Sequence, residues 1–284
     1  MPGVIEQLLS SHLFSLEIFR ESFLRYALLA GLLSGTVCAF IGVYVILRRI
    51  VFLGVALSQA AALGVALGLF AGWSPEAAAL GLALATALLF SLPRRSRVLS
   101  IESLVGWMYV VAAGLATILI AKNPKAEAHG LDVVSGMLLY ASPKEIWQLA
   151  AMAAVVFSVL VSLHRMLVFV SFDKETARSM GLKTWAYELC FYACLGLSVS
   201  LAMKTAGILF VFASLLIPAM ISLTLFRRMW LILLGAVLVV IVSVPVGISL
   251  SFHGDLPTGP AIVAVYAGVF FLVSTARLVY SLLR

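Results

Sequence analysis

The sequence predicts an all-α, polytopic membrane protein, and three observations carry this prediction. Hydrophobic residues fill 63% of the 284 positions, charged residues fill only 11%, and the mean hydropathy is +1.16. A soluble domain averages roughly 25% charged residues, so this chain could not maintain a surface that faces water. Its apolar runs are close to the length of about 20 residues that a helix needs to cross a bilayer. Residues 1–284 are therefore expected to form a single transmembrane domain.

Nine apolar runs follow one another along the chain, and the pattern allows eight to ten membrane helices. The expected helices are 25–47, 51–70, 76–92, 101–121, 146–163, 185–203, 206–226, 230–251 and 259–279. Residues 4–20 predict a short amphipathic helix that lies on the membrane surface. The connection 122–145 is too long for a turn, and its residues 130–139 are expected to form a short helix.

Basic residues flank the apolar runs singly or in small groups, which is the pattern of anchors at a membrane face. If the N-terminus lies outside, 13 of the 19 Lys and Arg residues fall in cytoplasmic segments. Cytoplasmic loops are enriched in positive residues, so the pattern predicts an outside N-terminus and a cytoplasmic C-terminus. The same scattered distribution argues against nucleic acid as a partner, despite a net charge of +7.

The centres of the apolar runs contain almost no ionisable residues, and this limits how any transport could be driven. An ion-coupled carrier usually needs such groups within the membrane. Here Glu102, Glu188 and Lys204 lie near helix ends, and the deepest polar pair is Ser58 and Gln59. The chain also lacks the phosphate loop GxxxxGKS/T, so any ATP hydrolysis must occur on a partner chain. No cofactor is expected in this chain.

A short helix is predicted at 172–182, between the fifth and sixth apolar runs. Asp173 is a good N-cap residue, and Gly181 is a natural stop at the C-terminal end. The predicted topology presents this helix to the cytoplasm, either to dock on another protein or as an ordinary linker at the membrane interface. The residues expected to contact a partner there are Asp173, Glu175, Ala177, Met180 and Gly181.

Several segments taken together resemble the permease subunits of ABC importers for zinc, manganese and iron. They are 42–60, 172–182, 206–219 and 255–260, in the family's order and with similar spacing. The resemblance implies a homodimer in the bacterial inner membrane, with a substrate pathway along the dimer axis. It also implies an ABC ATPase subunit docked on the coupling helix at 172–182, and an extracytoplasmic binding protein that delivers the substrate.

The chain departs from this family's pattern within one motif. The family usually has Gly-Asp-Ala-Leu-Ser-His where this chain has Gly54-Val55-Ala56-Leu57-Ser58-Gln59. The resemblance implies that the Asp and His contact the metal in the pathway, so Val55, Ser58 and Gln59 are the expected pathway residues here. Valine cannot coordinate a metal, and a neutral amide oxygen is a poor ligand for zinc. The chain then either passes a metal ion without that pair or carries another species, such as a metal chelate.

Two further pairs are candidate metal ligands, both in segments predicted to lie outside. His129 and Asp132 occur in the long connection, and His253 and Asp255 occur in the last outside loop. Each pair fits a metal or binding-protein contact, and each also fits solvated loop residues, with Asp255 capping the final helix. The expected function is the permease subunit of an importer for a divalent transition metal or a metal chelate. The open alternatives are a permease for a non-metal substrate, a non-transporting scaffold and a secondary carrier.

Overall fold

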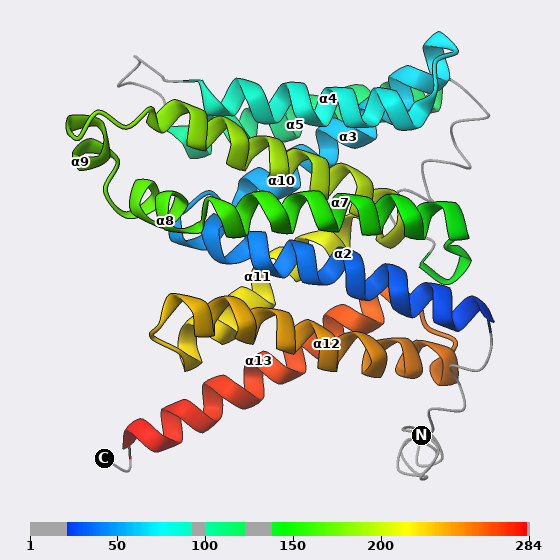
Figure 1. Cartoon of the computed structure of the whole chain (residues 1–284). Helices are drawn as coiled ribbons and strands as arrows, with labels where there is room; N and C mark the ends of the chain where they lie inside the picture. The colour runs from blue at the N-terminus through cyan, green and yellow to red at the C-terminus, as the bar shows by residue number, and fades with distance from the viewer. Residues whose placement is uncertain (1–21, 93–99, 123–137, 283–284) are drawn as a thin grey trace.

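The computed structural model describes residues 22–92, 100–122 and 138–282, and every regular element in these ranges is helical (Figure 1). The first group comprises α2 (Ser22–Leu47), α3 (Val51–Ala71), α4 (Pro75–Ser91) and α5 (Ile101–Ala121). The 3-10 turn η2 (Leu138–Tyr140) precedes α7 (Pro143–Ser162), α8 (His164–Phe172) and α9 (Lys174–Ser179). The last group comprises α10 (Thr184–Ala206), α11 (Ile208–Leu225), α12 (Met229–Gly254) and α13 (Thr258–Leu282).

Each apolar run identified in the sequence corresponds to one helix of the structure. Within the described ranges, eight helices are long and apolar enough to cross a membrane, and α4 is shorter, with 17 residues. The prediction of an all-α membrane protein is confirmed, and the number of qualifying helices falls within the predicted eight to ten. The amphipathic helix expected at 4–20 and most of the helix expected at 130–139 lie outside the described residues.

The long helices run side by side and alternate in direction, so their ends meet at two opposite faces of the bundle (Figure 1). At one face Lys204, at the end of α10, meets Glu76 and Glu145, at the starts of α4 and α7. At the other face Arg48, which follows α2, meets Ser171 of α8. We name these the Lys204 face and the Arg48 face. That the Arg48 face is cytoplasmic remains a prediction from the distribution of basic residues.

Small residues allow the helices to pack closely around α2. The most apolar stretch of α2 is 72% buried, whereas that of α13 is 11% buried, so α2 is central and α13 is peripheral. A Cβ atom added to Gly42 would lie 1.8 Å from the carbonyl oxygen of Leu215, which places the backbones of α2 and α11 in direct contact. Gly64 of α3 likewise lies against the backbone of Ala78. Such close approach at small residues is typical of helices packed within membranes.

Candidate functional site

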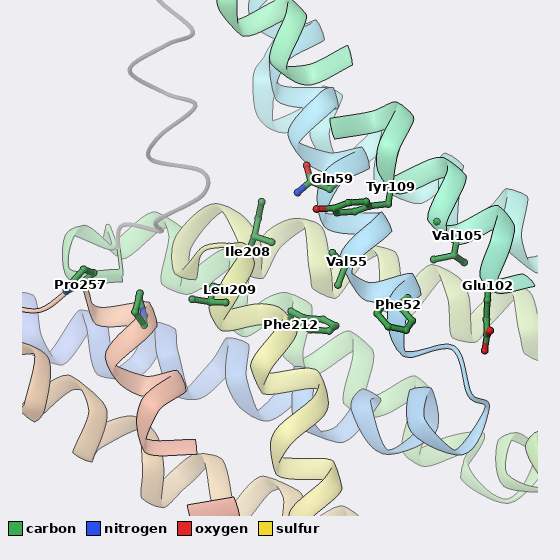
Figure 2. A pocket seen from close by; sticks show the side chains of 12 residues that line it. Phe52, Val55, Gln59, Glu102, Val105, Tyr109, Ile208, Leu209, Phe212 and Pro257 are labelled. Carbon is green, nitrogen blue, oxygen red and sulfur yellow. The ribbon is translucent and has the colours of Figure 1, made fainter. Parts of the chain in front are cut away.

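Helix α3 presents Val55 and Gln59, two of the three residues expected along the pathway, to a pocket. The two residues are four positions apart and therefore share one face of the helix. Both are partly buried, and both line a cavity of about 960 Å³ (Figure 2). The pathway role of the pair is a proposal developed below.

Ser58 does not line this pocket, although the sequence analysis grouped it with Val55 and Gln59. Its side chain is fully buried, and its hydroxyl donates a hydrogen bond of 3.0 Å to the carbonyl oxygen of Gly54, one turn back. A serine hydroxyl can be satisfied within its own helix in this way, whereas a glutamine amide has no equally simple local partner. Ser58 is therefore a packing residue of α3, and Gln59 is the polar group that α3 presents to the cavity.

The opposite walls of the pocket come from helices far away in the sequence (Figure 2). The other residues that line it are Phe52, Glu102, Val105, Gly106, Tyr109, Ile208, Leu209, Phe212, Pro257 and Pro260. Tyr109 of α5 and Gln59 of α3 extend from neighbouring helices toward the same part of the cavity, and Glu102 lies at a distance from both (Figure 2). Sequence reasoning missed Tyr109, and it placed Glu102 only at a helix end.

The chemistry of the pocket is mostly apolar, with one amide, one phenol and one carboxylate among its lining side chains. Zinc prefers nitrogen and sulfur ligands. Magnesium, calcium and manganese prefer oxygen ligands from carboxylates, carbonyls and water. Across residues 22–92, 100–122 and 138–282, three or more His, Cys, Asp or Glu side chains never gather closely enough to hold a metal ion. The pocket therefore offers hydrogen-bonding groups from Gln59 and Tyr109 and one carboxylate from Glu102, within an otherwise apolar wall.

The second pair of candidate metal ligands lies at the Lys204 face, in the turn between α12 and α13. His253 has its Nδ1 within 2.9 Å of the carbonyl oxygen of Ser249, one turn back in α12. Asp255 is exposed and follows α12 in a left-handed conformation, with φ of 47°. This geometry accounts for both residues as parts of a helix end. The first pair, His129 and Asp132, lies outside the described residues.

A separate capped helix, α9, lies at the Arg48 face beyond the long helices (Figure 1). Asp173 is its N-cap, because its carboxylate accepts hydrogen bonds from the backbone N–H and the hydroxyl of Thr176. These bonds hold the pKa of the Asp173 carboxyl below its usual range. At the other end Gly181 has φ of 80°, and the N–H of Leu182 donates to the carbonyl of Ala177. This is the glycine-terminated end that the sequence predicted.

The side chains of α9 divide into an inward and an outward set, which alters one detail of the predicted contact surface. Glu175 is exposed, and Met180 is 68% exposed to solvent, so both side chains are available to a partner. Ala177 is fully buried against its own chain. The sequence analysis placed Ala177 on the contact surface beside Met180, and the structure instead makes it the residue on which α9 packs.

The described residues form a bundle of membrane-length helices with a pocket among them and a small capped helix outside it, which is the architecture of a polytopic membrane protein. Residues 20–277 match the ABC 3 transport family, and the chain belongs to this family. It is accordingly a multi-pass protein of the bacterial inner membrane and a transporter subunit rather than an enzyme.

Similar proteins support this assignment along nearly the whole chain. A manganese transport system membrane protein of Halalkalibacterium halodurans is 26% identical over 256 residues, covering 90% of this chain and 88% of that protein. A chelated iron transport system membrane protein of Yersinia pestis is 26% identical, covering 90% of this chain and 86% of that protein. The structure of PsaBC from Streptococcus pneumoniae in complex with Fab has the same fold, with a TM-score of 0.80 and 21% identity. The match covers 90% of this chain and 92% of that chain.

Proposed function

We propose that the chain is the permease subunit of an ABC importer for a transition metal, taken up in hydrated or chelated form. In this proposal two copies pair in the membrane around a shared pathway, and separate ATPase subunits supply the energy. An extracytoplasmic binding protein delivers the substrate to the Lys204 face. The manganese and chelated-iron systems to which the relatives belong support a metal substrate.

The observation that carries the proposal is the exposed apolar surface around α9. Phe172 and Met180 flank this helix and remain 70% and 68% exposed, on a segment capped at both ends. Because α9 lies beyond the membrane-length helices, lipid around those helices does not account for this exposure, and we take it as a surface that another protein covers. An ATPase subunit that receives α9 in a cleft would cover them and would convert its own movement into movement of the permease.

A complex assembled in proteoliposomes tests the proposal. The chain is co-expressed and purified with an ABC ATPase from the same genome, and ATP-driven accumulation of manganese and of ferric citrate is measured. Uptake of either probe that requires ATP supports the importer. A chain that binds no ATPase, or that hydrolyses ATP with no accumulation of either probe, would contradict it and favour a scaffold role.

The composition of the α3 wall favours a chelate over a bare ion. Val55 and Gln59 offer one neutral amide, and this replaces little of the water shell of a divalent cation. Restoring the family pair with Val55→Asp and Gln59→His should raise the uptake of the free ion relative to that of the chelate. If the wild-type membrane region already binds manganese or zinc tightly, and Gln59→Leu leaves that binding intact, this preference is wrong.

A further inference from the structure

Arg48 occupies an unusual position at the turn between α2 and α3. Its Nε donates a hydrogen bond of 2.9 Å to the hydroxyl of Ser171, 123 residues away in the sequence. Its guanidinium carbon lies 4.2 Å from the ring centroid of Phe191, a cation–π contact with α10. Its Nη2 is buried and has no hydrogen-bond partner among the described residues. The side chain thus joins three helices and keeps one donor group unused.

The partner of Arg48 on α8 is directly connected to the base of α9. Ser171 precedes the N-cap Asp173 by two residues, and its hydroxyl donates to the carbonyl of Leu167 while it accepts from Arg48. The next residue after the cap, Lys174, forms an ion pair of 2.6 Å with Glu188 of α10. A displacement of α9 must therefore disturb Ser171 or the Lys174–Glu188 pair.

Glu188 also acts on Arg48. It lies one helical turn before Phe191, the residue beneath the guanidinium, so both face the same region. Burial lowers the pKa of the Arg48 guanidinium, and the nearby Glu188 carboxylate opposes this effect. Arginine keeps its charge in proteins, so the unused Nη2 is a charged donor available to this carboxylate once Lys174 leaves it.

On its other side Arg48 is connected to the pocket by a very short turn. Arg49 has φ of 57°, and the N–H groups of Arg49 and Ile50 donate to carbonyls of the last turn of α2. Helix α3 then begins at Val51 and carries the pocket residues Phe52, Val55 and Gln59. Because this turn is short and closed by its own hydrogen bonds, a displacement of the Arg48 backbone would be passed on to the start of α3.

We propose that Arg48 is the positioning residue that transmits movement of α9 to the pocket wall on α3. The proposal rests on the proposed function, in which α9 docks on an ATPase. When α9 moves, the ion pair between Lys174 and Glu188 breaks, and the free Nη2 of Arg48 donates a hydrogen bond to the Glu188 carboxylate instead. Because the planar guanidinium stacks on Phe191 while it bonds to Ser171, lysine cannot replace it. The protein thus has two states, one with Glu188 paired to Lys174 and one with Glu188 paired to Arg48.

The test distinguishes a role of Arg48 in transmitting movement from α9 to α3 from a role in the stability of the folded protein alone. Wild type, Arg48→Gln, Arg48→Lys and the control Arg227→Gln, at an exposed position between α11 and α12, are each assembled with the ATPase in proteoliposomes. The number of manganese ions accumulated per ATP hydrolysed should fall about fivefold in both Arg48 variants, a typical effect for a residue that couples two sites. ATP hydrolysis should persist, and Arg227→Gln should behave as wild type. Hydrolysis and uptake that fall in parallel, with an unchanged ratio, would overturn the proposal.

Two further measurements keep the proposal testable if an Arg48 variant fails to assemble or if manganese is not the substrate. Ser171→Ala removes the contact while leaving Arg48 in place, and an unchanged transport ratio in this variant would also overturn the proposal. In a variant with Cys38, Cys190 and Cys194 replaced by alanine, thiol labelling of Gln59→Cys reports on the pocket without a substrate. ATP should change this labelling, and adding Arg48→Gln should abolish the change. A wild-type chain that binds no ATPase disproves the proposed function itself.

Discussion

The side-chain nitrogen of Lys204 lies 2.7 Å from a carboxylate oxygen of Glu76 and 3.0 Å from one of Glu145. The three residues belong to the end of α10 and the starts of α4 and α7, so one cation joins three helix ends. Glu145 has a second role, because it forms a capping box with Ser142 at the start of α7. The cluster fixes the relative heights of three helices at the Lys204 face.

Replacing Lys204 with methionine should lower the free energy of unfolding by about 1 kcal/mol, because partly exposed ion pairs contribute little individually. The loss arises from two carboxylates left close together without a cation. Lys204→Arg should retain most of the stability, and the deficit of the methionine variant should shrink in high salt. Thermal unfolding of the purified protein in detergent, at low and high salt, measures both effects. Equal midpoints for wild type and Lys204→Met would show that the cluster is not stabilising.

Gly42 should tolerate no larger residue. The added methyl group of Gly42→Ala would overlap the carbonyl oxygen of Leu215, which belongs to a helix backbone and cannot rotate away. Overpacking of this kind costs about 1–3 kcal/mol. Gly114→Ala is the matched control, because a Cβ there meets nothing within 4 Å and alanine is the better helix former. We expect Gly42→Ala to unfold at lower temperature and Gly114→Ala at the same or higher temperature; the reverse order would exclude direct contact between α2 and α11.

Helix positions were predictable from the sequence because apolar runs in a membrane protein follow directly from the solvent. The observed helices begin and end within a few residues of the predicted runs. The start of α7 is one difference: the run suggested residue 146, and the helix begins at Pro143, because the Ser142–Glu145 capping box extends it. Polar residues at a helix start carry this information, and hydropathy alone misses it.

The pocket could be predicted only on one side. The spacing of Val55 and Gln59 places both residues on one face of α3. Ser58, which the sequence analysis grouped with them, is instead bonded within its own helix. Tyr109 and Phe212 come from α5 and α11, and no periodicity of a single helix reveals which helices are neighbours. Ala177 was assigned to the wrong face because a six-residue helix has no periodic pattern to orient it. The buried His164 is another contact that the sequence does not reveal: its Nδ1 lies 2.7 Å from the hydroxyl of Tyr44.

The predicted topology requires opposite reporter signals from two positions of the chain. Met180 lies after α9 at the Arg48 face, and Gly254 ends α12 at the Lys204 face (Figure 1). A fusion after residue 180 should report the cytoplasm, and a fusion after residue 254 should report the outside, because basic residues favour the cytoplasmic side. Phosphatase and fluorescent-protein reporters give complementary readings. Reversed signals would place α9 outside and remove its proposed contact with an ATPase.

The N-cap of α9 should depend on pH through Asp173. Hydrogen bonds from Thr176 hold the pKa of this carboxyl below its usual value, so ionised Asp173 stabilises the folded helix. That stabilisation is complete above the unfolded-state pKa of about 3.9 and is lost as pH falls through the lower folded-state value. Protection of the Thr176 amide from hydrogen exchange should therefore decrease in acid. Asp173→Asn keeps an acceptor for the cap and should show protection that does not change with pH in this range. An identical decrease in both proteins would assign the effect to another group.

The polar side chains of the pocket, Gln59 and Tyr109, should affect substrate uptake. If the substrate hydrogen-bonds to the wall, Gln59→Leu and Tyr109→Phe should each lower its uptake about fivefold, since one hydrogen bond is worth about 1 kcal/mol. Each substitution removes polar groups at nearly constant volume, so the packing of α3 against α5 is preserved. Ser58→Ala is the control, because the Ser58 hydroxyl is already bonded to Gly54 inside α3 and does not reach the cavity. A chelate with free donor and acceptor groups should be affected more than a hydrated ion, whose mobile water molecules can compensate. If Gln59→Leu and Tyr109→Phe take up the substrate as well as wild type and Ser58→Ala do, the substrate passes this cavity without contacting its polar side chains.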